Sequence, residues 1–123
     1  MRCVEQEKSS DGVRIFKALD RERLLSALRL WAVETQRCHA EVLRIGLFGS
    51  YARGDYAPGS DADILILVRH CQQPQWFLRA LAYDTASLPL GVDLLVYTEE
   101  ETRRLSDRSR WFGRILSEIV WLS

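Results

Sequence analysis

The stretch Gly-Ser-Tyr-Ala-Arg-Gly-Asp-Tyr-Ala-Pro-Gly-Ser-Asp-Ala-Asp, residues 49–63, decides the fold of this chain. An apolar run at residues 42–48 leads into it, and a second at residues 64–68 follows it. Both runs have the length and composition of buried strands. Gly49 and Ser50 predict a tight turn between them, because little side-chain bulk there blocks approach to the backbone. The sequence therefore predicts two strands joined by a turn that a ligand can reach.

Two carboxylates open the second of these strands. Asp61 and Asp63 are two residues apart, so both side chains project from one face of the sheet. Each aspartate alone is more often a polar residue at a strand edge. Beside the Gly49-Ser50 turn, however, the pair favours a phosphate-binding turn next to metal ligands.

The pattern Gly-Ser, ten residues, then Asp-x-Asp resembles the signature of the polymerase-β-like nucleotidyltransferases. Gly49, Ser50, Asp61 and Asp63 fit that spacing without a gap. The variant Gly-Ser-Tyr-Ala-Arg-Gly followed by Ser-Asp-x-Asp is similar to the minimal nucleotidyltransferase branch. Many members of that branch are antitoxins paired with small helical HEPN ribonuclease toxins. The resemblance extends from about residue 24 to the end of the chain.

This resemblance implies an enzyme that moves AMP from ATP to a protein hydroxyl, here a tyrosine of a cognate HEPN toxin. Nucleotidyl transfer needs a held triphosphate and two divalent ions, expected here as Mg²⁺ bound by oxygen ligands. Asp61 and Asp63 are the expected ligands, and Asp93, at the start of a third strand, completes the catalytic set. Gly49 and Ser50 are expected to bind the phosphates. Arg53 is a further candidate for phosphate binding, unless it ties the turn to a neighbouring carboxylate.

Two other functions remain open from the sequence. Nucleotidyl transfer to a small molecule such as an aminoglycoside would use the same residues, although a short chain leaves little surface for such a substrate. A non-catalytic antitoxin could instead bind the toxin and occlude it. The intact set of carboxylates argues against occlusion alone.

Composition narrows the class of protein. The chain has 123 residues, with 17 basic and 17 acidic side chains and a formal net charge of zero. We expect no direct binding of nucleic acid, which requires a basic face. No apolar run reaches the length of a membrane span, and three cysteines give no disulfide framework, so a cytoplasmic protein is expected. Residues 1–13 are predicted to be a flexible lead-in, and residues 14–123 a single nucleotidyltransferase domain.

The remaining elements follow from periodicity and capping signals. The expected order is a helix at residues 20–38, strands at 42–48 and 61–68 with a short helix at 51–53 between them, a helix at 74–87, a strand at 92–97, helices at 98–105 and 111–119, and an edge strand at 119–122. In the helix at 74–87, Phe77, Leu78, Leu81 and Ala82 are expected to point inward.

The proposed chemistry also predicts the topology. If Asp61 stands near Ser50, the first two strands are antiparallel. If Asp93 joins Asp61 and Asp63, the second and third strands are parallel and connected by a right-handed crossover. The expected fold is α/β (α+β): a small mixed sheet of three to four strands with helices packed on it, as in the polymerase-β-like nucleotidyltransferases.

A second group of metal-ligating residue types lies at the other ends of the first two strands. Cys38 and His39 precede one strand, and His70 and Cys71 follow the next, so antiparallel pairing brings them together. Adjacent residues point in different directions, and the usual spacing of zinc ligands is absent. We therefore assign these four residues to element ends and not to the site.

Overall fold

The computed structural model describes residues 20–123, so the predicted lead-in at residues 1–13 lies outside the described residues. The elements, in chain order, are α1 (Arg21–Cys38), β1 (Val42–Phe48), α2 (Ser50–Arg53), β2 (Ala62–Val68), α3 (Trp76–Arg79), the 3-10 turn η2 (Ala80–Ala82), β3 (Val92–Thr98), α4 (Glu99–Arg108), α5 (Arg110–Glu118) and β4 (Val120–Trp121). Among these residues, no helix is both long enough and apolar enough to cross a membrane.

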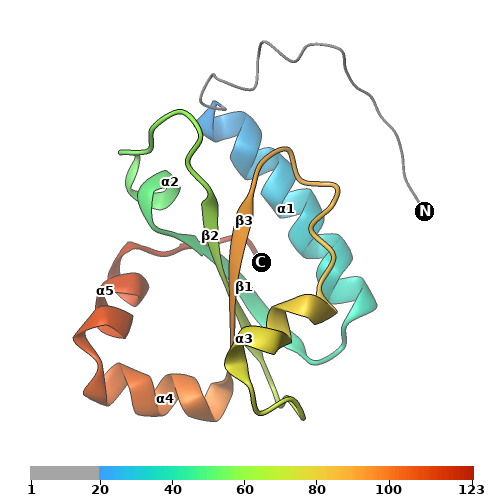
Figure 1. Cartoon of the computed structure of the whole chain (residues 1–123), viewed down its shortest axis with the longest axis vertical. Helices are drawn as coiled ribbons and strands as arrows, with labels where there is room; N and C mark the ends of the chain where they lie inside the picture. The colour runs from blue at the N-terminus through green and yellow to red at the C-terminus, as the bar shows by residue number, and fades with distance from the viewer. Residues whose placement is uncertain (1–19) are drawn as a thin grey trace.

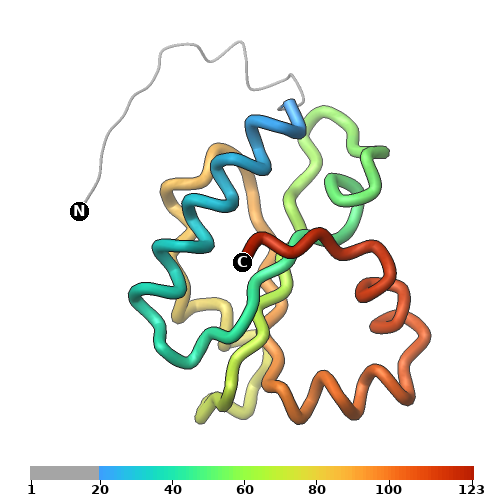
Figure 2. The backbone as a smooth tube through the Cα atoms, turned by 180° about the vertical axis from the view of Figure 1, so that it is seen from behind, coloured from blue at the N-terminus to red at the C-terminus, as the bar shows by residue number. Residues whose placement is uncertain are grey.

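The four strands form one mixed sheet in the order β3-β2-β1-β4. Strand β1 pairs antiparallel with β2 and with β4, whereas β2 and β3 are parallel. Helix α1 covers one face of the sheet, and α4 and α5 lie on the opposite side (Figures 1 and 2). This arrangement confirms the predicted mixed sheet and both predicted strand pairings.

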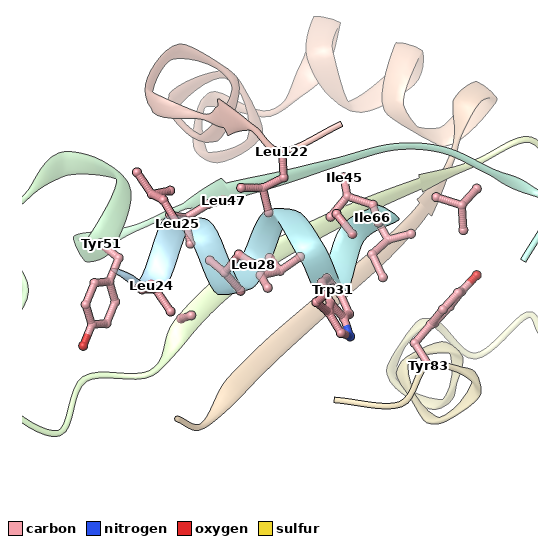
Figure 3. Close-up of a cluster of buried hydrophobic side chains, with 14 of the residues drawn as sticks. Leu24, Leu25, Leu28, Trp31, Ile45, Leu47, Tyr51, Ile66, Tyr83 and Leu122 are labelled. Carbon is pink, nitrogen blue, oxygen red and sulfur yellow. The ribbon is translucent and has the colours of Figure 1, made fainter. Parts of the chain in front are cut away.

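The α1 face holds the larger core. Leu24, Leu28 and Trp31, spaced by three or four residues along α1, are at most 6% exposed. They pack toward Ile45 and Ile66 of the two central strands (Figure 3). Burying a side chain of this size contributes about 1.5–3 kcal/mol, so this predicted helical stripe fixes α1 on the sheet.

The opposite face has a smaller core. Phe48 and Leu65 of the central strands meet Phe112 and Ile115 of α5, and all four side chains are buried. Because both faces of the sheet are covered, the central strands β1 and β2 are mostly apolar, with Arg44 and Asp63 as the charged exceptions. Helix α5 is thereby placed over the strand ends that carry Phe48 and Asp63.

The prediction of a long helix at residues 74–87 is wrong. Helical structure is limited to α3 and η2, and Tyr83 is already extended, with φ −118° and ψ 128°. Three of the side chains expected inside are exposed: Phe77 at 56%, Leu78 at 39% and Leu81 at 81%. Ala82 is exposed as well.

Long-range contacts explain why this segment leaves the helical path. The buried Arg79 guanidinium donates hydrogen bonds to the carbonyl oxygens of Gln73 and Val96. The indole N–H of Trp31 donates to the carbonyl oxygen of Asp84 at 2.8 Å, and the Tyr83 hydroxyl donates to Glu41 at 2.8 Å. Residues 79, 83 and 84 are thus each bound to a different part of the chain. Because these tertiary contacts require a path that one helix cannot follow, they override the local helical pattern.

The ends of β1 and β2 away from the Gly49 turn meet as predicted. The backbone N–H of Arg69 donates to the carbonyl oxygen of Glu41 at 2.8 Å. His39 lies 3.5 Å from the Glu41 carboxylate, measured between Nδ1 and Oε2, and its ring packs on Tyr83. Cys38 and Cys71 are free thiols. The described residues here pack as ordinary ends of secondary-structure elements.

Candidate functional site

The Gly49 turn at the end of β1 requires glycine. Its φ is 79°, a conformation that residues with a side chain rarely adopt. A Cβ atom at this position would also collide with the carboxylate of Asp63. Helix α2 starts at the next residue, Ser50, and the N–H of Arg53 returns to the Gly49 carbonyl at 3.0 Å. The turn and the second strand are thus in direct contact.

Two of the three predicted aspartates are register partners. Asp63 of β2 is the partner of Asp93 of β3 in the parallel pair, so both carboxylates start on the sheet face that α5 covers. Asp63 is half-buried and Asp93 is exposed. Asp61 lies just before β2, is exposed, and has its carboxylate against Gly91, two residues before Asp93.

The charges around Asp63 favour its protonated form. Burial raises the pKa of Asp63, and the neighbouring carboxylates of Asp93, Asp61 and Glu118 raise this pKa further, against the lowering effect of Arg53. Unbalanced carboxylates of this kind suit a divalent cation that prefers oxygen ligands. Among residues 20–123, however, no three Asp, Glu, His or Cys side chains converge tightly enough to form a ligand set. Asp61, Asp63 and Asp93 thus have carboxylates of the kind that Mg²⁺ prefers, but the structure does not bring the three together as a ligand set.

Glu118, at the end of α5, contacts the turn directly. Its carboxylate accepts a hydrogen bond from the Gly49 N–H at 2.7 Å and one from Arg53 Nη1 at 3.1 Å. Arg53 also pairs with Asp55 at 3.1 Å. The structure thus shows Arg53 tied to two carboxylates, the second of the two roles considered for it.

A hollow of about 260 Å³ connects these groups. It is lined by Phe48, Gly49, Ser50, Arg53, Asp63, Trp111, Arg114, Ile115 and Glu118. Asp93 lines a different and larger hollow, of about 700 Å³, beside residues 80–86.

Sequence reasoning missed the contribution of α5 to this site. Trp111, Arg114 and Glu118 lie along α5, with Trp111 50% exposed. Glu118 is 69 residues from Gly49 in the chain, and no spacing rule links them. The amphipathic pattern of α5 predicts its buried face but does not indicate which element its polar end will meet.

Comparison with known proteins identifies the family of this chain. Residues 32–116 match the family model of the nucleotidyltransferase domain. A Methanocaldococcus jannaschii protein described as a candidate protein adenylyltransferase is 69% identical over 26 residues, which make up 21% of this chain and 26% of that protein. The chain thus matches about a quarter of the length of this curated relative.

Two solved structures are similar in fold. A candidate nucleotidyltransferase from Sulfolobus solfataricus superposes with a TM-score of 0.59 at 22% identity, covering 95% of this chain and 90% of that one. A toxin–antitoxin structure with AMP-PNP gives a TM-score of 0.49 at 22% identity, covering 77% and 72%. The Sulfolobus match confirms the predicted fold class.

Proposed function

The chain belongs to the nucleotidyltransferase domain family, and from that membership we propose that it moves AMP from ATP to a hydroxyl group of a partner protein. The observation that carries this proposal is the register pairing of Asp63 with Asp93 beside the Gly49 turn. A short segment of strong identity to a protein described as a candidate protein adenylyltransferase supports a protein acceptor.

The three aspartates and the Gly49-Ser50 turn have distinct roles in this reaction. The Ser50 hydroxyl and the backbone N–H groups of the turn hold the β- and γ-phosphates of ATP. Asp61, Asp63 and Asp93 would hold two Mg²⁺ ions, which when bound neutralise phosphate charge and stabilise the attacking and leaving oxygens. Asp93 also accepts the proton of the acceptor hydroxyl as its oxygen attacks the α-phosphorus. The bond to the β-phosphate oxygen breaks, and pyrophosphate leaves.

The acceptor that we propose is a tyrosine of a HEPN-type toxin, with this chain as its antitoxin. The support is the Gly-Ser-Tyr-Ala-Arg-Gly variant of the turn, residues 49–54, followed by Ser-Asp-x-Asp. Attaching AMP adds a bulky phosphodiester and a negative charge, which changes how the modified segment binds its surroundings. Modification at or near the toxin's active site would silence it.

Transfer of label from ATP tests the proposal. The protein is incubated with Mg²⁺, ATP labelled on the α-phosphate, and a candidate HEPN-type partner protein. We expect label on the HEPN-type protein with the wild type, none with Asp61→Ala, and normal labelling with Asp107→Asn, an exposed position on α4. Equal labelling by the wild type and Asp61→Ala would overturn the proposal.

The same variants separate catalysis from occlusion. If the protein acts by transfer, an Asp61→Asn/Asp63→Asn double variant fails to protect cells that express the toxin. Full protection by a folded double variant would show that binding alone is sufficient.

A further inference from the structure

Glu118 occupies an anion-binding position of the candidate site. Its carboxylate accepts hydrogen bonds from the Gly49 N–H at 2.7 Å and from Arg53 Nη1 at 3.1 Å. A backbone N–H at a tight turn and an arginine guanidinium are the donors with which proteins commonly bind phosphate oxygens. The side chain of Glu118 is only 14% exposed, so it sits within the site and not at its rim.

Two features of this position are unfavourable for a carboxylate. Glu118 is the last residue of α5, where the helix dipole favours a positive charge. It also lies close enough to Asp63 for its negative charge to contribute to the raised pKa of that carboxyl. A tether that only held α5 to the turn would need no negative charge beside Asp63. A local conflict of this kind is expected at functional positions.

We propose that Glu118 acts as a built-in substitute for phosphate, which the triphosphate of ATP displaces when it binds. This inference rests on the proposed function, because it takes the Gly49 turn as the phosphate-binding element. In the free protein, Glu118 satisfies the Gly49 N–H and holds Arg53 in place. In the nucleotide complex, a phosphate oxygen takes over these donors, and Arg53 becomes a phosphate ligand.

The surroundings of Glu118 provide a place for the displaced carboxylate. Arg114 precedes Glu118 by four residues on α5 and lines the same hollow. Side chains four residues apart on a helix are neighbours and can form an ion pair. Displacement therefore moves Glu118 from Arg53 toward Arg114 without unfolding α5. Displacement of Glu118 also breaks its hydrogen bonds to Gly49 and Arg53. Nucleotide binding therefore releases the end of α5 from the Gly49 turn.

The consequence is a specific effect on affinity. Glu118 competes with the incoming phosphates and repels them, so it lowers the affinity for polyphosphate. Replacement by glutamine keeps the shape and one acceptor for the Gly49 N–H but removes the charge. We expect Glu118→Gln to bind Mg·ATP and inorganic triphosphate about tenfold more tightly than the wild type. Glu118→Ala, which removes the competitor altogether, should bind at least as tightly.

Titration calorimetry with Mg·ATP and with inorganic triphosphate tests this inference on the full chain. Glu100→Gln is the matched control, because it removes the same charge from a side chain on α4 that is 74% exposed; its affinity should stay within twofold of the wild type. Asp55→Asn removes the other carboxylate partner of Arg53 and leaves the Gly49 N–H untouched. It should change the affinity less than threefold.

The outcomes separate this inference from the proposed function. Tighter polyphosphate binding by Glu118→Gln without any labelled product supports the inference and contradicts the transfer reaction. Weaker or unchanged binding by both Glu118 variants, with melting temperatures like that of the wild type and transfer intact, makes Glu118 a plain tether and overturns the inference alone. Absence of polyphosphate binding by the wild type and by both Glu118 variants overturns the inference and removes the basis of the proposed function.

Discussion

Asp63 of β2 and Asp93 of β3 are register partners in the only parallel strand pair that the described residues form. Like charges on directly paired positions destabilise a sheet unless a counterion or proton relieves them. Because β2 and β3 are parallel, their first residues lie at the same edge of the sheet. The pairing therefore places the Asp63 and Asp93 carboxylates side by side, as the proposed transfer reaction requires.

Asp63→Asn should make the folded protein more stable and, at the same time, much less active. Because burial and neighbouring carboxylates raise the pKa of Asp63, removing its charge should raise the free energy of unfolding at pH 7 by on the order of 1 kcal/mol. Nucleotidyl transfer should fall about a hundredfold or more. Urea unfolding and a labelled-ATP assay measure both effects. A destabilised variant, or one with normal transfer, would contradict this prediction.

The stability difference between Asp63→Asn and the wild type should depend on pH. A folded-state pKa above the unfolded value means that the ionised group destabilises the folded protein at neutral pH. As the pH falls through the folded pKa, Asp63 becomes protonated and the advantage of asparagine disappears. Unfolding curves of the two proteins should therefore differ at pH 7 and coincide at pH 3. Asp107→Asn, measured in the same way, is the control for a carboxylate outside the site.

Gly49→Ala should abolish transfer and destabilise the fold by about 2–3 kcal/mol, since it adds left-handed strain and a collision with Asp63. Two other glycines separate these causes. Gly54 has a comparable φ of 94°, but a Cβ added there would meet no atom within 4 Å. Gly54→Ala should therefore lower the free energy of unfolding by only about 1–2 kcal/mol and retain activity. Gly113→Ala, in open space on α5, should gain about 0.5–1 kcal/mol. Chemical denaturation ranks the three variants, and the ranking fails if Gly54→Ala costs as much as Gly49→Ala.

Arg21 should affect nucleotide binding from a distance. Its guanidinium donates to the carbonyl oxygens of Tyr51 and Ala52, at 2.8 and 3.1 Å, and so ties the start of α1 to α2. Arg21→Ala should cost about 1–2 kcal/mol of stability and raise KM for ATP several-fold, with kcat nearly unchanged. Lysine cannot reproduce the two-pronged contact, so Arg21→Lys should restore only part of the loss. Steady-state kinetics checks this, and full rescue by lysine would argue against it.

Glu101 should make the fold acid-sensitive. The hydrogen bonds from Arg79 hold the pKa of Glu101 at about 2, below its ordinary value of 4.5. A lowered folded pKa contributes stability above the unfolded value, and this stability is lost as the pH falls from about 5 to 2. Glu101→Gln should lose about 2 kcal/mol at pH 7. It should also show a flatter dependence of stability on pH across that interval. Parallel slopes for the two proteins between pH 5 and pH 2 would refute this assignment.

The capping signal at Thr98 shows where local sequence is sufficient. Thr98 was expected to start a helix, and its hydroxyl accepts the Glu101 N–H while Glu101 accepts the Thr98 N–H. Both contacts lie within four residues, so the pattern predicts them directly. Strand β1 has the predicted bounds for a similar reason, because its residues 45–48 form an apolar run that is buried between two layers.

The segment after β2 shows where local sequence fails. Residues 74–87 have a helical pattern of apolar side chains, yet Leu81 is exposed and Tyr83 is buried and extended. The hydroxyl of Tyr83 reaches Glu41, which is 42 residues earlier in the chain. Periodicity cannot predict such a partner, because it reports only which side chains share a face.

The sequence alone determined the turn at Gly49 and the family, because these depend on the spacing of residues 49–63. It also determined two of the three strand pairings, because the motif requires the starts of β2 and β3 to lie near the end of β1. It also predicted that Asp61, Asp63 and Asp93 would start neighbouring strands. Only the tertiary structure placed Glu118 on the Gly49 N–H and kept residues 74–87 from forming one helix. These features arise from contacts between distant segments, and which segments meet depends on how two layers of helices pack on one sheet.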